Sequence, residues 1–366
     1  MLRKFVVLAA LSLALAGWAS AAKPGASPTV SIMTQNLDDG TDLTYVIAAL
    51  TGQIPLSAEQ AVDLTYLELH AGDFEKRARF LARNIADRAP EVIALQEAVL
   101  WRVGPTPESA TDVLFDQLDL LLSALRKNKV PYDVVATVTM LDLALPGDKI
   151  GGALRFTDRN AILVRSDLQR PGFFISNVQS DTFTATFDVF GFPVPAGWIS
   201  ADIHTGTKVF RLFTTHLQTP IAEIDAAAAV QLKQADELIA LANSTAIPVV
   251  ICGDFNSDAS NAGPSVDDTL TVGNIEASGY ADVWPFTHRP RDLGLTWPLF
   301  LEDQFPGGGL PPPFFADSEP FERIDLFFSK NIEVRGSSLV ITPVPGGFKA
   351  PPFASDHAGV IATFKP

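Results

Sequence analysis

The stretch Val249-Val250-Ile251-Cys252-Gly253-Asp254-Phe255-Asn256 is the starting point for interpreting the chain. Its four leading residues are all apolar, which predicts a short strand buried on both faces. The Ala-rich residues 221–242 before it predict a long helix. A helix leading into a buried strand is typical of layered α/β folds, in which ligands bind beyond the carboxyl ends of strands. Asp254 and Asn256 are therefore the first candidates for a functional site.

The same order of helix and strand occurs earlier in the chain. Residues 74–88 carry apolar side chains at helical spacing, and residues 92–96 form a second apolar run that ends at Glu97. Two further helices are expected at 57–69, where Ser57 and Gln60 form a capping box, and at 111–127. Strands are expected at 29–36, 132–139, 161–164, 183–190, 198–203, 209–215, 324–328 and 360–364. The chain thus has two helix–strand units, at 74–96 and 221–252, with a strand-rich stretch between them. This combination predicts one α/β domain with mixed sheets.

Composition limits the class of protein. The chain has 366 residues, of which 47% are hydrophobic and 19% charged, so a disordered chain is excluded. Its single cysteine, Cys252, excludes internal disulfide bonds and Cys-based zinc sites. With 42 acidic against 27 basic residues, the chain is a poor candidate for a dedicated nonspecific nucleic-acid binder, although a local basic cleft remains compatible.

The N-terminus has the pattern of a secretory signal peptide. Arg3 and Lys4 precede an apolar run at residues 5–16, and Ala19-Ser20-Ala21 predicts cleavage after Ala21. The run is too short for a transmembrane helix. We therefore expect residues 22–366 to form a single secreted or periplasmic domain with no stable membrane anchor. Cleavage removes Arg3 and Lys4, so the mature net charge becomes 25 − 42 = −17.

Polar residues with catalytic chemistry follow or directly precede several apolar strand-like runs. Each has a simple structural interpretation on its own, such as a turn, an acid at a helix start or a structural histidine. Their occurrence together at strand ends favours a common site. They are Asn36, Glu97, His216, Asp254, Asn256, Asp325, Asp356 and His357.

The order of these motifs resembles the endonuclease/exonuclease/phosphatase superfamily. That superfamily includes DNase I-like nucleases, abasic-site endonucleases, bacterial sphingomyelinases and inositol polyphosphate 5-phosphatases. The matching pieces are Gln35-Asn36, Gln96-Glu97, Thr215-His216-Leu217, Gly253-Asp254-Phe255-Asn256, Arg323-Ile324-Asp325 and Ser355-Asp356-His357. The resemblance implies a DNase I-like four-layer sandwich of two mixed β-sheets flanked by helices, with the site at one rim.

The candidate residues suit hydrolysis of a phosphate ester. Mg²⁺ prefers oxygen ligands, so Asn36 and Glu97 are predicted to hold it, with Asp356 completing or flanking the site; Mn²⁺ and Ca²⁺ are alternatives. Asp254 is expected to orient or deprotonate the attacking water, with Asn256 fixing its geometry.

The two histidines complete the predicted site. His216 and His357 are expected to donate hydrogen bonds to negative charge developing on phosphorus. The resemblance implies that Asp325 orients His357.

Two further motifs carry weaker predictions. The resemblance implies that Arg159 and Asn160, within Asp158-Arg159-Asn160, contact the substrate phosphate; a surface salt bridge of Arg159 is an equal alternative. Thr296-Trp297 resembles a Thr-Trp element near the site in that family, but a core aromatic is the preferred interpretation of Trp297.

The substrate remains open at this stage among nucleic acid, phospholipid and small phosphate esters. Two stretches, residues 38–73 and 298–321, are interpreted as insertions, and the second is rich in Phe. These rings suit contact with a lipid interface, although folding back over the sheet rim is preferred. A nuclease needs a basic groove, and its candidate residues are scattered: Arg77, Arg79, Arg155, Arg159, Arg289 and Arg291.

We therefore rank a secreted metal-dependent phosphodiesterase or phosphatase first. A sphingomyelinase-like phospholipid phosphodiesterase and a DNase I-like nuclease follow, and a noncatalytic binding protein on the same fold comes last. No protein partner is evident.

Overall fold

The computed structural model describes residues 29–41, 43–189, 192–220, 225–260, 269–302, 315–345 and 351–366. The predicted signal peptide lies outside these residues, as does the centre of the stretch 298–321. Among the described helices, none is long and apolar enough to cross a membrane.

In this part of the chain, the first large sheet holds eight strands. Their bounds are Val30–Asn36 (β1), Val92–Gln96 (β2), Leu100–Gly104 (β3), Asp112–Asp116 (β4), Tyr132–Pro146 (β5), Ala153–Arg165 (β6), Glu333–Val340 (β17) and Gly359–Lys365 (β18). The strand order is β17-β18-β1-β2-β6-β3-β4, and β5 pairs with β6. β1 and β2 are parallel, whereas β18 and β6 flank them in antiparallel pairing, so the sheet is mixed.

The second large sheet holds six strands within the described ranges. They are Phe173–Thr182 (β7), Gly197–Thr205 (β10), Lys208–His216 (β11), Val249–Asp254 (β12), Ala281–Asp282 (β13) and Asp325–Lys330 (β16). The order is β13-β16-β12-β11-β10-β7, with β11 and β12 parallel. Two small hairpins accompany it: Phe187–Val189 (β8) with Phe192–Val194 (β9), and Phe300–Glu302 (β14) with Phe315–Asp317 (β15).

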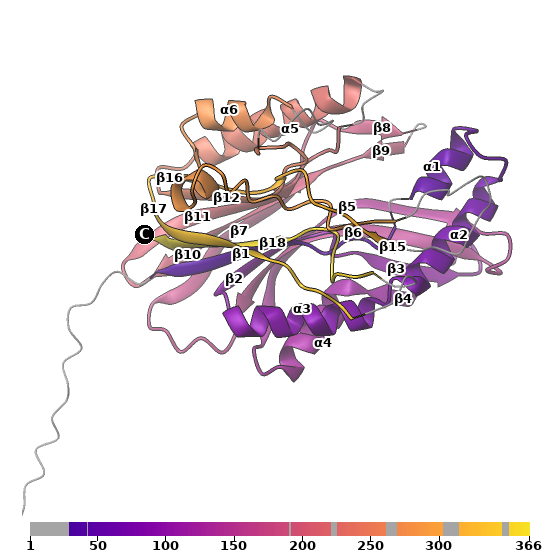
Figure 1. The fold of residues 1–366 in the computed structure, drawn as a ribbon, viewed down its shortest axis with the longest axis horizontal. Helices are drawn as coiled ribbons and strands as arrows, with labels where there is room; N and C mark the ends of the chain where they lie inside the picture. The colour runs from indigo at the N-terminus through magenta and orange to yellow at the C-terminus, as the bar shows by residue number, and fades with distance from the viewer. Residues whose placement is uncertain are drawn as a thin grey trace, which may run out of the picture.

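Helices cover both outer faces of the paired sheets. The α-helices in the described residues are Thr44–Leu50 (α1), Ala58–Ala71 (α2), Phe74–Arg88 (α3), Gln117–Lys127 (α4), Asp225–Asn243 (α5), Thr271–Ala277 (α6) and Val283–Thr287 (α7). In Figure 1, α3 and α4 lie below the first sheet, and α5 and α6 lie above the second. The predicted four-layer sandwich of two mixed sheets flanked by helices is confirmed.

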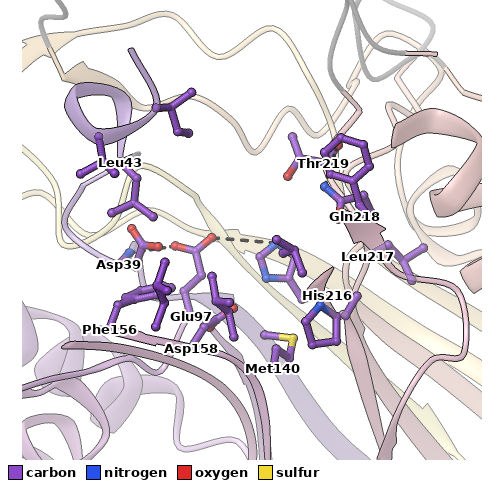
Figure 2. Close-up of a pocket in the computed structure, with 18 of the residues that line it drawn as sticks. Asp39, Leu43, Glu97, Met140, Phe156, Asp158, His216, Leu217, Gln218 and Thr219 are labelled. Carbon is purple, nitrogen blue, oxygen red and sulfur yellow. Dashed lines mark hydrogen bonds and ion pairs between the residues drawn. The ribbon is translucent and has the colours of Figure 1, made fainter. Parts of the chain in front are cut away.

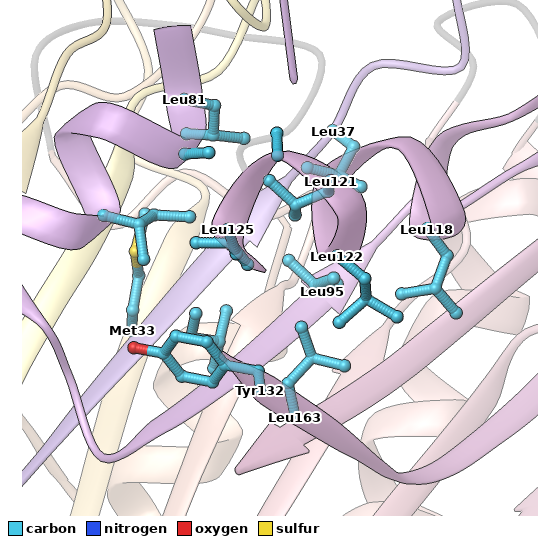
Figure 3. Packing of buried hydrophobic residues seen from close by; sticks show 14 of the residues in the cluster. Met33, Leu37, Leu81, Leu95, Leu118, Leu121, Leu122, Leu125, Tyr132 and Leu163 are labelled. Atoms are coloured by element: carbon cyan, nitrogen blue, oxygen red, sulfur yellow. The ribbon is translucent and has the colours of Figure 1, made fainter. Parts of the chain in front are cut away.

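Three apolar layers hold the sandwich together. Between the sheets, strand residues such as Ile32, Ile162 and Leu212 are fully buried. Between the first sheet and its helices, the Leu side chains of α4 meet Leu95 and Leu163 (Figure 3). A third cluster joins α5 to the outer face of the second sheet. Because burying an aliphatic side chain contributes about 1.5–3 kcal/mol, these layers fix the positions of the strand ends.

Two secondary-structure predictions need correction. The helix expected at 111–127 begins only at Gln117, because β4 pairs with β3 and the Asp116 side chain accepts the Asp119 N–H at 3.2 Å, which caps the helix there. The strand expected at 183–190 is not continuous, because β7 ends at Thr182 and the Phe183 N–H instead donates to the Ala196 carbonyl, before the short β8 begins.

The residues between β1 and α3, interpreted as an insertion, form two helices. The capping box of Ser57 and Gln60 at the start of α2 is present as expected. Val46 of α1 and Val62 of α2 join an apolar cluster with Trp101 and Phe156 of the first sheet. This stretch is therefore packed on one end of the sandwich (Figure 1).

Candidate active site

Strand register brings the predicted residues together. Across the second sheet, His216 at the end of β11 pairs with Asp254 at the end of β12, and Asp254 pairs with Asp325 at the start of β16. In the first sheet, Asn36 at the end of β1 pairs with Gln96, which precedes Glu97. The two sheets thus end in polar residues at the same rim of the sandwich.

The backbone conformations at Gly253, Glu97 and Asn256 are unusual. Gly253 has φ 148° and lies so close to β11 that an added Cβ would be 2.0 Å from the Thr215 carbonyl oxygen. Glu97 and Asn256 have φ values of 51° and 45°, in the left-handed region that non-glycine residues rarely adopt. Such conformations cost about 1–3 kcal/mol each and are common at functional sites.

His357 is held between two carboxylates. Its Nδ1 lies 2.9 Å from Asp325 Oδ2, and its Nε2 lies 3.8 Å from Asp254 Oδ2. All three residues are buried. Asp325 is itself fixed, because its N–H donates to Thr296 Oγ1 at 3.3 Å. Asp325 therefore fixes the orientation of the imidazole ring and leaves Nε2 facing Asp254.

His216 approaches the same carboxylate from the other side. Its Nε2 lies 3.7 Å from Asp254 Oδ2 and 4.0 Å from Glu97 Oε1. The Asn256 N–H donates to Asp254 Oδ1 at 2.9 Å, and the Asn256 amide donates to the Leu217 carbonyl at 2.9 Å. Asp254 is thus immobilised between two imidazoles.

Asn36 links Glu97 to this cluster. Its amide nitrogen donates to Glu97 Oε1 at 2.7 Å and to Asp254 Oδ2 at 3.0 Å, while its Oδ1 accepts the Asp38 N–H at 2.9 Å. The Asp39 N–H donates to Glu97 Oε2 at 2.8 Å. In this arrangement Asn36 positions the Glu97 carboxylate.

Asp356 completes the rim. Its Oδ2 lies 3.9 Å from His357 Nε2 and accepts the indole N–H of Trp297 at 2.9 Å. Trp297 is only half-buried, so the preferred interpretation of this residue as a core aromatic is wrong. The Ser355 hydroxyl donates to the Asn36 carbonyl at 2.8 Å, which ties the loop before β18 to the end of β1.

The clustered carboxylates determine the charge of the histidines. Burial alone would lower the pKa of His357, but Asp325, Asp356 and Asp254 raise it well above its usual range. For His216, Asp254 and Glu97 likewise outweigh burial and raise the pKa. Burial raises the pKa of Asp356, against the opposing influence of His357. The closely spaced carboxylates thus favour the protonated form of both imidazoles.

The donor set fits a divalent cation. Ligand atoms of Glu97, His216 and Asp254 lie within 4.8 Å of one another, as do those of Asp254, Asp325 and His357. In the described part of the chain, Oδ1 of Asp158 is buried with no hydrogen-bond partner and is thus a further oxygen donor. Carboxylate oxygens suit Mg²⁺, Mn²⁺ or Ca²⁺ better than softer metals.

Arg159 and Asn160 lie apart from this hydrogen-bonded cluster. The Arg159 guanidinium donates to Asp116 Oδ1 at 2.7 Å and to the Ala98 carbonyl at 2.8 Å. Asn160 is fully buried, and its amide nitrogen lies 3.6 Å from the Met140 sulfur. Their predicted contact with substrate phosphate stays a prediction.

Two acidic residues of the site were absent from the sequence-based set. Asp39 and Asp158 line a cavity together with Glu97 and His216 (Figure 2). Burial raises the pKa of Asp158 to about 7, with a smaller contribution from Glu97 and opposition from His216. Asp158 belongs to the motif Asp158-Arg159-Asn160, and Asp39 follows β1 by three residues. Their positions next to strands were therefore the only sequence feature that indicated a place in the site.

Comparison with known proteins identifies the family and the fold of the chain. A profile of the Endonuclease/Exonuclease/phosphatase family matches residues 67–357. No curated protein matches the chain. An endonuclease/exonuclease/phosphatase from Beutenbergia cavernae DSM 12333 is 20% identical, with a TM-score of 0.56 over 92% of this chain and 71% of that one.

Two other solved structures have the same fold. A family protein from Leptotrichia buccalis C-1013-b is 17% identical, with a TM-score of 0.52 over 92% of this chain and 100% of that one. A D. rerio TDP2 humanized by 14 mutations is 16% identical, with a TM-score of 0.51 over 92% and 99% of the two chains. These structures confirm the predicted fold, and the profile confirms the family resemblance.

Proposed function

Since this chain belongs to the endonuclease/exonuclease/phosphatase family, whose members are typically hydrolases of phosphoesters, we propose that it is a divalent-metal-dependent phosphoesterase. It hydrolyses a phosphodiester or phosphomonoester by in-line attack of water. The observation that carries this proposal is the pair of imidazoles, His216 and His357, on either side of the buried Asp254 carboxylate at 3.7 and 3.8 Å.

Asp254 activates the water. Its carboxylate is held by the Asn256 N–H and by the Asn36 amide, so it is oriented before substrate binds. A fixed carboxylate accepts the proton of the attacking water, a contribution of typically about 10²–10⁴-fold in rate. Asn256 and Asn36 act by positioning this group.

The histidines stabilise charge on the phosphoryl group. Neighbouring carboxylates raise the pKa of both rings, which favours the doubly protonated donors. Asp325 accepts one N–H of His357 and so directs the other toward the reacting centre. Preorganised donors of this kind are among the largest contributors to catalysis.

Glu97 is the main candidate to hold the cation, which we propose to be Mg²⁺, with Asp356 flanking it. A bound divalent cation polarises a phosphoryl oxygen and offsets charge on the leaving group. Asn36 and the Asp39 N–H hold the Glu97 carboxylate.

The test is hydrolysis of bis(p-nitrophenyl) phosphate and p-nitrophenyl phosphate by the full chain, with Mg²⁺, Mn²⁺ or Ca²⁺ and with a chelator. We expect metal-dependent release of p-nitrophenolate and a loss of about 10²–10⁴-fold in kcat for His216→Ala. The matched control is His204→Ala, because His204 bonds Ser176 on the same sheet, outside the site. Activity in the chelator equal to that with metal would contradict the metal dependence. Full activity of His216→Ala would contradict the site.

We also propose that the protein is exported. The support is the basic start, apolar run and small-residue cleavage pattern of residues 1–21. The N-terminal sequence of protein recovered from outside the cytoplasm would be expected to begin at Ala22. Recovery with Met1 retained would contradict cleavage.

A further inference from the structure

A cleft leads away from the catalytic acids into an apolar enclosure. Its volume is about 400 Å³, and its polar end is formed by Asp39, Glu97, Asp158 and His216. Figure 2 shows these residues between Leu43 on one side and Leu217 to Thr219 on the other. The size falls in the range of small-molecule sites.

Beyond the four titratable residues, the walls of the cleft are mainly apolar, with more aliphatic side chains than aromatic ones; they also include Phe156, Phe187, Gln218 and Thr219. α1 contributes Val46, Ile47 and Leu50, and β5 contributes Met140 and Leu143. Ile47 and Leu50 are 44% and 47% exposed, although both line the cleft. Exposed apolar side chains next to one another around a concave site mark a surface that a ligand covers.

Charge distinguishes between possible ligands. Among the described residues that line the cleft, none is Lys or Arg. Four of the six arginines considered for a nucleic-acid groove are paired with carboxylates of the same chain: Arg77 with Asp38, Arg79 with Glu75, Arg155 with Asp142 and Arg159 with Asp116. Because no Lys or Arg lines the cleft in the described part of the chain, its walls form no ion pairs with a polyanion, which disfavours nucleic acid as the ligand.

We propose that this cleft binds the alkyl chain of a phosphodiester whose phosphate lies against His216, Asp254 and His357. The proposal rests on the proposed function for the position of the phosphate. The chain would extend from the polar end along α1 and β5. Most of the wall side chains are aliphatic, which favours a flexible alkyl group over a polar base, and a ligand with a single negative charge suits a described lining that has no Lys or Arg.

The experiment measures binding of methyl n-alkyl phosphates, which are diesters with one negative charge, to the full chain in Mg²⁺ by isothermal titration calorimetry; the alkyl group is ethyl, butyl, hexyl or octyl. We expect the Kd to fall by about two- to fourfold for each added methylene until the cleft is filled. The double variant Ile47→Ser/Leu50→Ser should flatten this dependence, since both side chains are partly exposed and their loss spares the core. Leu67→Ser is the matched control, because Leu67 is 54% exposed on α2 and does not line the cleft.

Three results would overturn the proposal. They are a Kd independent of chain length, a double variant with the slope of the unchanged protein, and tighter binding of methyl phenyl phosphate or a dinucleotide than of methyl octyl phosphate. Hydrolysis of bis(p-nitrophenyl) phosphate, measured on the same preparations, reports separately on the proposed function. Cleavage with no chain-length dependence would reject the alkyl site alone, and chain-length dependence without cleavage would reject the catalytic proposal alone.

Discussion

Replacing Asp325 by Asn isolates the role of one carboxylate in the proposed mechanism. Asp325 is 2% exposed, and its Oδ2 accepts the N–H of His357 Nδ1 at 2.9 Å. Asn has nearly the same volume, so packing around Thr296 is kept. The substitution removes the negative charge that holds the His357 imidazole oriented and protonated.

The size of the effect follows from the geometry. Two unit charges at the distance of this pair attract by about 6 kcal/mol at an effective dielectric constant of about 20. An amide at the same place keeps part of the hydrogen bond, so the imidazolium is destabilised by about 3–5 kcal/mol. Each 1.36 kcal/mol corresponds to about tenfold in rate, so kcat should fall by about 10²–10⁴-fold.

The assay is steady-state hydrolysis of bis(p-nitrophenyl) phosphate across pH. We expect a lower kcat with little change in KM, and an acidic shift of the descending pH limb, because the pKa of His357 loses its largest raising influence. Asp202→Asn is the control, since Asp202 pairs with Arg211 on the same sheet away from His216. A kcat within twofold of the unchanged protein, with the same pH profile, would refute the assigned role of Asp325.

Three further substitutions test stability. Asp282→Ala should cost about 3–5 kcal/mol in urea denaturation, because it leaves the buried Arg323 guanidinium, held at 2.7 Å, without its carboxylate. Gly253→Ala should cost about 2–6 kcal/mol in the same measurement, since the new Cβ would be 2.0 Å from the Thr215 carbonyl oxygen at φ 148°. Asp158→Asn should stabilise the metal-free protein at pH 8 by about 1–3 kcal/mol and have little effect at pH 4. Burial raises the folded-state pKa of Asp158 to about 7, so the stability that its protonated form contributes is present below the unfolded pKa and is lost as the pH rises through 7. Asn stays neutral and avoids this loss. Urea denaturation at pH 4 and pH 8 measures the difference.

Each of these predictions has a matched control or an outcome that would contradict it. Gly273→Ala adds a Cβ that meets nothing within 4 Å, so it should not destabilise the protein. Glu333→Ala breaks an exposed pair and should cost less than about 1 kcal/mol. Equal losses for Gly253→Ala and Gly273→Ala, or for Asp282→Ala and Glu333→Ala, would show that the proposed contacts are not responsible. For Asp158→Asn, the same change in the free energy of unfolding at both pH values would contradict the role assigned to its raised pKa.

Much of the site was predictable because strand ends carry the chemistry. Apolar runs such as residues 249–252 identify buried strands, and the polar residue after each run then belongs to a rim. This reasoning selected Asn36, Glu97, His216 and Asp254, whose side chains the structure places in one hydrogen-bonded or ion-paired cluster. Strand register aligns the residues within each sheet, and the packing of the two sheets brings Asn36 against Asp254 and Glu97 against His216.

Other features depend on packing between distant segments. The pattern at 111–117 fits a helix and a strand equally, and only pairing of β4 with β3 decides between them. Whether Trp297 belongs to the core or to the rim depends on Asp356, which is 59 residues away in sequence.

The sequence by itself determined the fold class and the candidate residues at the strand ends, because hydrophobic period and residue type act locally. Tertiary structure alone decided the surroundings of the site. It placed Asp39 and Asp158 beside Glu97 and closed an aliphatic cleft with α1, since cavities and the burial of charge arise only where separate elements pack against each other.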